Sequence, residues 1–158
     1  MSVEEVRSKG GSPSGLDLAD GLATKKQDAI LLLARVCLGW IFVQSGILKL
    51  TGLQPFSTRG WSAEWFFGPL GATVELIGGA LLILGLATRY ACLVMLLFMV
   101  IATFSNHRYW DYPPAAMQGQ KAHFFKNLSI FGGFLVFYVI GAGRYSLDWL
   151  IARSKRGS

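Results

Sequence analysis

The sequence predicts an all-α integral membrane protein, built as a four-helix bundle with short aromatic extramembrane segments. Of its 158 residues, 53% are hydrophobic and only 15% are charged, whereas a soluble domain carries about a quarter charged residues. The mean hydropathy is +0.44. The charged residues gather near the chain ends and in two connecting segments, so long apolar runs remain between them. This composition excludes a disordered chain and argues against a soluble enzyme, and two cysteines are too few for a disulfide-stapled scaffold.

Four apolar runs predict the four membrane-spanning helices. A helix needs about 20 residues to cross the hydrocarbon core of a bilayer. The runs are Ala29–Leu50, Leu70–Ala87, Tyr90–Ser105 and Asn127–Gly143. Only Thr88 and Arg89 separate the second run from the third, so these two spans are expected to form a tight helical hairpin.

The sequences on either side of the spans are polar. Residues 1–28 are predicted to be a disordered cytoplasmic tail, in which Leu16 to Leu22 form at most one helical turn at the membrane surface. Residues 29–150 form the domain of four transmembrane helices, and residues 151–158 form a basic C-terminal tail.

Two connecting segments, 51–69 and 106–126, are rich in aromatic residues. Such residues prefer the headgroup region of the bilayer, so both segments are expected to lie there and to cover one end of the bundle. Pro113 and Pro114 are expected to make the middle of the second segment non-helical. The aromatic residues are Trp61, Trp65, Phe66, Phe67, Tyr109, Trp110 and Tyr112.

The chain is basic, with a formal charge of +6, and its lysines and arginines lie mostly beside the apolar runs. Because no nucleic-acid motif accompanies this charge, it indicates contact with lipid rather than nucleic acid. Cytoplasmic ends of membrane helices carry an excess of Lys and Arg, which predicts that both termini are cytoplasmic. The cytoplasmic set is then Lys25, Lys26, Arg89, Arg144, Arg153, Lys155 and Arg156, against Lys49, Arg59, Arg108, Lys121 and Lys126 outside.

Glu75 is the only acidic residue within the four predicted spans. A charge within the membrane is costly and usually faces a partner inside the bundle. Side chains at the same depth are Lys49, His107, His123 and Lys126, and together with Glu75 they form the predicted outer polar cluster. Cations, a carboxylate and imidazoles are suited to binding a quinone carbonyl or relaying protons, although a purely structural ion pair accounts for the same residues.

A second polar set, the predicted inner cluster, comprises Arg35, Asp148, Ser146 and Arg89. Asp148 is expected to compensate the charge of Arg35, which lies deeper in the bilayer than Arg89. For Arg89, extension of the side chain toward the headgroups is the simpler interpretation. Two histidines so far apart in sequence do not form a metal motif, and no metal site is predicted. Cys37 and Cys92 form no CxxC motif and are expected to pack.

The chain resembles the DoxX family of small four-helix bacterial membrane proteins. The resemblance rests on "ARVCLGWIFVQSGILKL", "ELIGGALLILGLATR", His107 and "GAGRYSLDW", in that order, and covers about three quarters of the chain from Ala34 to Trp149. It implies a bacterial inner-membrane protein, some of whose relatives belong to thiosulfate:quinone oxidoreductases or redox-stress complexes. It implies no covalent cofactor, makes quinone the candidate ligand, and supplies no catalytic residues.

Three functions are compatible with these features. The first is a quinone-linked redox protein or the membrane subunit of a redox complex, which the resemblance favours. The second is a small transporter or channel lined by the charged face of the first span. The third is a membrane scaffold that joins a larger complex through its aromatic segments. Because the sequence contains no recognisable cofactor-binding element, independent enzymatic activity is left open.

Overall fold

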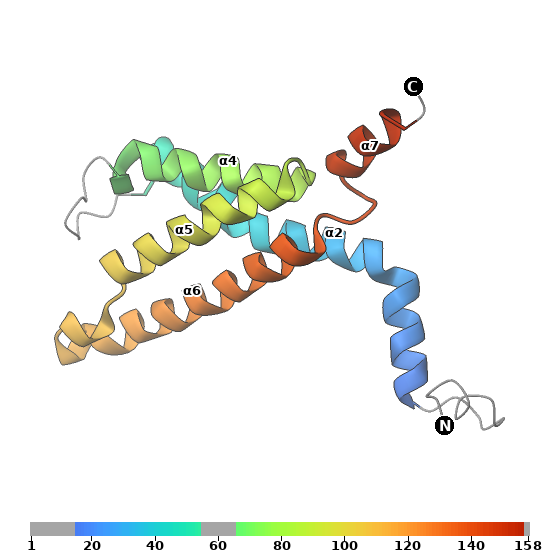
Figure 1. Ribbon diagram of the computed structural model, residues 1–158. Helices are drawn as coiled ribbons and strands as arrows, with labels where there is room; N and C mark the ends of the chain where they lie inside the picture. The colour runs from blue at the N-terminus through green and yellow to red at the C-terminus, as the bar shows by residue number, and fades with distance from the viewer. Residues whose placement is uncertain (1–14, 55–65, 157–158) are drawn as a thin grey trace.

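The computed structural model describes residues 15–54 and 66–156, and all regular elements in these ranges are helical (Figure 1). The predicted all-α class is therefore confirmed. The elements are α2 (Gly15–Leu50), η1 (Phe66–Leu70), α4 (Gly71–Leu84), α5 (Thr88–Asn106), η2 (Tyr109–Asp111), α6 (Pro114–Ile140) and α7 (Leu147–Ser154). The predictions made for residues 1–14, Arg59, Trp61 and Trp65 lie outside the described residues.

Four of these helices, α2, α4, α5 and α6, run alongside one another as a bundle (Figure 1). Within the described residues, three segments are long and apolar enough to cross a membrane: Ala19–Leu50, Thr88–Asp111 and Pro114–Ile140. The segment that contains α4, Gly68–Leu84, is equally apolar in character but shorter. Many large apolar side chains of the bundle point outward, Ile77, Leu97 and Val139 among them. An apolar outer surface of this extent is suited to lipid and not to water.

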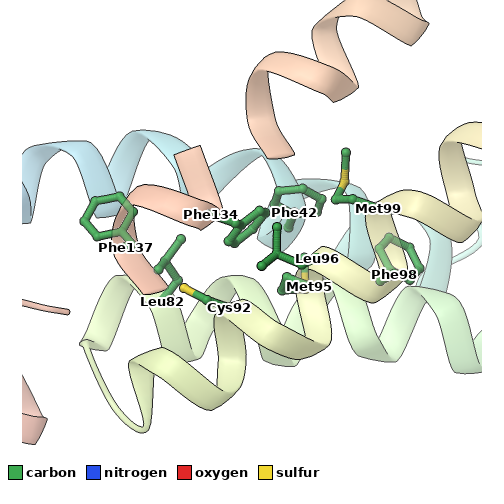
Figure 2. Close-up of a cluster of buried hydrophobic side chains, with 9 residues drawn as sticks. All are labelled: Phe42, Leu82, Cys92, Met95, Leu96, Phe98, Met99, Phe134 and Phe137. Carbon is green, nitrogen blue, oxygen red and sulfur yellow. The ribbon is translucent and has the colours of Figure 1, made fainter. Parts of the chain in front are cut away.

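All four helices contribute to the core (Figure 2). Phe42 from α2 meets Phe134 from α6 with their ring centroids 5.5 Å apart. Around this pair lie Leu82 of α4, Cys92, Met95, Leu96, Phe98 and Met99 of α5, and Phe137 of α6. Cys92 therefore has the packing role expected from the sequence, whereas Cys37 is exposed on α2.

Helices α2 and α4 approach each other closely at glycines. A Cβ atom built on Gly39 lies 2.7 Å from the carbonyl oxygen of Gly79, and one built on Gly79 lies 2.7 Å from the carbonyl oxygen of Gly39. A Cβ on Gly46 lies 2.7 Å from the carbonyl oxygen of Ala72. Small residues allow such contact between membrane helices, so these glycines let the backbones of α2 and α4 pack against each other.

The hairpin between α4 and α5 closes earlier than predicted. Gly85 adopts a left-handed conformation with a φ of 65° and ends α4, and Ala87 also has a positive φ of 48°. Thr88 is already the first residue of α5. The turn is therefore residues 85–87 and not Thr88 and Arg89, because a left-handed glycine terminates a helix wherever it falls.

Three helix boundaries differ from the predicted spans. Helix α2 begins at Gly15, so residues 15–28 are helical, and in Figure 1 these dark-blue turns run away from the bundle. Residues with high helix propensity extend an adjoining long helix at little cost, because the unfavourable first turn has already formed. Helix α6 begins at Pro114, because proline is well accommodated in the first helical turn. Helix α7 continues to Ser154, into the predicted C-terminal tail.

Candidate functional site

A cavity of about 430 Å³ lies at the end of the bundle where α2 and α5 finish. All five residues of the predicted outer cluster line it: Lys49, Glu75, His107, His123 and Lys126. They come from four helices or their ends, so the bundle itself brings them together. Cavities of about 300–1,000 Å³ are typical of small-molecule sites.

The charged centre of the cavity is an ion pair between α2 and α4. Lys49 Nζ lies 2.7 Å from Glu75 Oε2 and 2.9 Å from Oε1. Ser45, one helical turn before Lys49, donates its hydroxyl proton to Oε2 at 3.0 Å. The Lys49 side chain is 20% exposed and that of Glu75 is 10% exposed, so the pair is shielded from bulk solvent and strongly coupled. Glu75 therefore meets the partner that the sequence predicted.

Two imidazoles form the opposite wall. The rings of His107 and His123 stack with centroids 5.1 Å apart. His107 Nδ1 lies 2.8 Å from Gln120 Oε1, and because an amide oxygen only accepts, Nδ1 is the donor. The hydrogen bond fixes the orientation of the His107 ring and leaves its Nε2 atom for exchange with a ligand or a proton.

Both apolar and polar side chains line the cavity. The apolar residues are Ile41, Phe42, Phe98, Met99, Ala102 and Ile130. Besides the five predicted residues, the polar ones include Ser45, Gln54, Asn106 and Asn127. Asn127 donates to Thr103 Oγ1 at 3.1 Å. The cavity is therefore amphipathic, and it suits a ligand with an apolar ring and polar substituents.

Sequence reasoning missed three side chains of this site: Ser45, Gln120 and Asn127. Ser45 lies four residues before Lys49 on α2 and Gln120 lies three residues before His123 on α6, which places each on the same helical face as its neighbour. This helical spacing could have identified Ser45 and Gln120 from the sequence. For Gln120 it was obscured by the expectation that Pro113 and Pro114 make the middle of segment 106–126 non-helical, which is wrong because α6 begins at Pro114.

Aromatic rings adjoin the histidine wall. Tyr109, Trp110, Phe124 and Phe125 contact one another, and the Tyr109 and Trp110 rings have centroids 5.0 Å apart. The aromatic grouping expected of segment 106–126 is present, carried by η2 and the first turns of α6. Its counterpart, Trp61 and Trp65 with the side chains of Phe66 and Phe67, lies outside the described residues.

At the other end of the bundle, Arg35 is fully buried, with 0% of its surface exposed. Its Nη2 atom donates to the carbonyl oxygen of Tyr145, and its Nε and Nη1 atoms have no partner among the described residues. A Cβ atom on Gly85 would collide with both Arg35 and Ser146. Arg35 and Ser146 of the predicted inner cluster are therefore packed around the Gly85 turn.

Arg35 and Asp148 form no direct ion pair in the described part of the chain, but an attractive electrostatic interaction still links their two charges. Asp148 instead accepts the N–H groups of Ala87 at 2.7 Å and Thr88 at 2.9 Å. The backbone amides at the start of a helix stabilise a nearby carboxylate. Asp148 therefore binds the amides at the start of α5 and not the side chain of Arg35. Its own N–H donates to the carbonyl oxygen of Gly85 at 2.9 Å.

Arg89 does not join this group. It is exposed on α5, and its Nη2 atom donates to the carbonyl oxygen of Val139 on α6 at 3.3 Å. This agrees with the simpler interpretation, a side chain extended at a helix end. Residues 15–54 and 66–156 contain no group of three or more His, Cys, Asp or Glu side chains that could hold a metal ion.

An all-helical bundle with a lipid-facing surface and an amphipathic cavity at one end defines a small integral membrane protein with a candidate ligand site. Comparison with known sequences specifies the family: the DoxX profile matches residues 30–108, and the chain belongs to the DoxX family. The resemblance noted from sequence motifs is thereby confirmed. The matched region includes Arg35, Lys49, Glu75 and His107, but ends before His123 and Lys126.

Three relatives of comparable length illustrate the family. The inner membrane protein YqjF of Escherichia coli K12 is 30% identical over 80% of this chain and 95% of its own. The inner membrane protein YphA of the same organism is 28% identical over 75% of this chain and 88% of its own. The uncharacterized membrane protein Rv3486 of Mycobacterium tuberculosis H37Rv is 32% identical over 72% of this chain and 76% of its own. No solved structure matches the chain.

Proposed function

We propose that this protein binds a quinone in the cavity at the end of α2 and α5 and acts as the membrane subunit of a redox complex in the bacterial inner membrane. The observation that supports the proposal is the amphipathic lining of the cavity. Lysines and imidazoles line it together with apolar side chains, within a bundle otherwise suited to lipid.

The residues fit a quinone head in size and in chemistry. A cavity of about 430 Å³ is large enough for a substituted ring. Phe42, Phe98 and Met99 offer apolar and polarisable surface to the faces of such a ring. Lys126 and His123 supply hydrogen-bond donors for its carbonyl oxygens.

When bound, a quinone accepts two electrons and two protons and becomes a quinol. In this proposal both protons come from water and pass to the quinone one at a time through Nε2 of His107, whose imidazole Gln120 orients through Nδ1. The ion pair with Glu75 holds Lys49 in place beside the cavity. A reduced partner subunit that carries a flavin or haem supplies the electrons, because the sequence has no cofactor-binding fingerprint of its own.

Two substitutions test this function, one by changing the volume of the cavity and one by changing its charge. Ala102→Trp fills the cavity and leaves its charges in place, whereas Glu75→Gln keeps the volume and removes the carboxylate. The protein is purified in mild detergent, its bound quinone is extracted and quantified, and a soluble short-chain quinone is titrated. We expect the wild type to bind quinone, Ala102→Trp to lose binding, and Glu75→Gln to weaken it at least about tenfold, because Lys49 loses the carboxylate that holds it beside the cavity.

Gly132→Ala serves as the matched control, since a Cβ at that position on α6 meets nothing within 4 Å. It should bind as the wild type does. Equal quinone binding by folded Ala102→Trp and wild-type protein contradicts the proposal. A wild type that binds no quinone contradicts it too, and favours the membrane scaffold.

We further propose that both termini are cytoplasmic, from the distribution of Lys and Arg. Single cysteines at Gly119 and Ser154, in a background of Cys37→Ala and Cys92→Ala, test the orientation. Both positions are exposed at opposite ends of the bundle. We expect a membrane-impermeant maleimide to label Gly119→Cys in spheroplasts and Ser154→Cys only after lysis. The reverse pattern contradicts this orientation.

A further inference from the structure

Helix α7 presents two arginines on one tryptophan. The Arg144 guanidinium carbon lies 5.6 Å from the centroid of the Trp149 ring, and that of Arg153 lies 5.3 Å from it. Each distance is within the range of a cation–π contact. Both guanidinium groups therefore lie beside the same indole, although they come from positions nine residues apart in the chain.

Neither arginine forms an ion pair with a carboxylate within the described ranges. Asp28 contacts the backbone of Arg144, where its Oδ1 atom accepts the N–H at 2.8 Å. The carboxylate of Asp148 is engaged with the N-terminal amides of α5. Lys155 and Arg156 follow directly, so this end of the molecule carries four closely spaced cations.

A second cavity, of about 390 Å³, opens beside these arginines. It is lined by Asp28, Arg144, Tyr145, Ser146, Trp149 and Leu150. The helix that follows also exposes apolar surface, since Leu150 is 54% exposed and Ile151 is 46% exposed. Cationic and apolar groups thus lie side by side on one short helix.

The position of α7 indicates which molecules its cationic and apolar surface contacts. The helix follows α6, a segment suited to crossing the membrane, after only residues 141–146. It lies beyond the bundle, next to the end of α6 (Figure 1). A tryptophan with flanking arginines at the end of a membrane helix lies at the level of the lipid headgroups. There the available anion is a phospholipid phosphate, with acyl chains that apolar residues can contact.

From this arrangement we infer a binding site for an anionic phospholipid, in which Arg144 and Arg153 bind the phosphate and Leu150 and Ile151 contact the acyl chains. The planar guanidinium group binds phosphate in a bidentate manner. Clusters of four or more Lys and Arg beside a membrane helix are typical of anionic-lipid recognition. The site is independent of the quinone cavity, which lies at the other end of the bundle.

Native mass spectrometry of the full chain tests the site. The protein in detergent is titrated with phosphatidylglycerol and, separately, with phosphatidylcholine of the same acyl chains. We expect the wild type to bind phosphatidylglycerol at least about tenfold more tightly than phosphatidylcholine. The double variant Arg144→Gln/Arg153→Gln should lose that preference, because it loses two phosphate ligands. Glycerol 3-phosphate, which has no acyl chains, should not compete.

Two further variants keep the test decisive. Arg144→Lys/Arg153→Lys retains the charge but loses the planar fork, so it should bind with intermediate preference and remain folded. Lys121→Gln removes a cation near the start of α6, at the opposite end of the bundle, and should bind as the wild type does. Equal binding of the two lipids by the wild type, or an unchanged preference in the folded glutamine variant, overturns the inference. Competition by glycerol 3-phosphate overturns it as well and points to a site for soluble phosphates.

Discussion

Replacing Lys49 by methionine is expected to lower the free energy of unfolding by about 3–5 kcal/mol, because it leaves a largely buried carboxylate without a cation. The side chain of Glu75 is 10% exposed and would retain only the hydrogen bond from Ser45. The double variant Lys49→Met/Glu75→Leu removes both charges and fills the space with apolar groups. It should be considerably more stable than the sum of the two single changes predicts.

Thermal unfolding in detergent measures these differences. The second ion pair in the described residues, between Arg108 and Asp111, provides the control, since its side chains are 51% and 47% exposed. Arg108→Gln should cost less than about 1 kcal/mol, as expected of a surface pair. If Lys49→Met costs no more than Arg108→Gln, the pair does not hold α2 and α4 together.

Adding a methyl group at Gly79 is the other change with a large expected effect. The new Cβ would lie 2.7 Å from the carbonyl oxygen of Gly39 and 3.0 Å from the backbone nitrogen of Val43. Backbone atoms cannot rotate away as a side chain can, so α2 and α4 must separate. Gly79→Ala is expected to destabilise the protein by about 1–3 kcal/mol, the usual cost of overpacking, and to disturb the Lys49–Glu75 contact.

Gly132→Ala separates this clash from the general effect of alanine. It lies inside α6 with nothing near its Cβ position, so alanine should stabilise the helix by about 0.5–1 kcal/mol. Both variants are compared by thermal unfolding in the same detergent. A Gly79→Ala protein as stable as Gly132→Ala would show that the two helices are not in close contact.

The helix bundle and the outer cluster could be predicted because each depends on a strong local pattern. Four apolar runs set the helices. The depth of Glu75 and Lys49 along their helices indicated that they meet, and they do so at 2.7 Å. The five predicted outer residues are lining residues of one cavity for the same reason. The function of these residues does not follow from the sequence pattern. The geometry of the cavity supports the proposed quinone site, and binding experiments test it.

The inner end could not be predicted from charge alone. Arg35 and Asp148 have opposite charges and similar depth, yet each forms its hydrogen bonds with backbone groups and not with the other: Arg35 donates to the carbonyl oxygen of Tyr145, and Asp148 accepts the amides of Ala87 and Thr88. Neither backbone partner can be predicted from the charges of the side chains. The early end of α4 at Gly85 exposes these amides, and that turn depends on the conformation of a single glycine.

Labelling with a photoreactive quinone tests the central claim most directly, because it reports where the ring lies. The labelled protein is digested and the modified residues are identified by mass spectrometry. We predict modification of the cavity residues Phe98, Met99 and Ile130, suppressed by excess unlabelled quinone and absent from Ala102→Trp. Labelling confined to lipid-facing residues of α5 such as Leu93 and Leu97, unaffected by Ala102→Trp, would contradict a quinone site in this cavity.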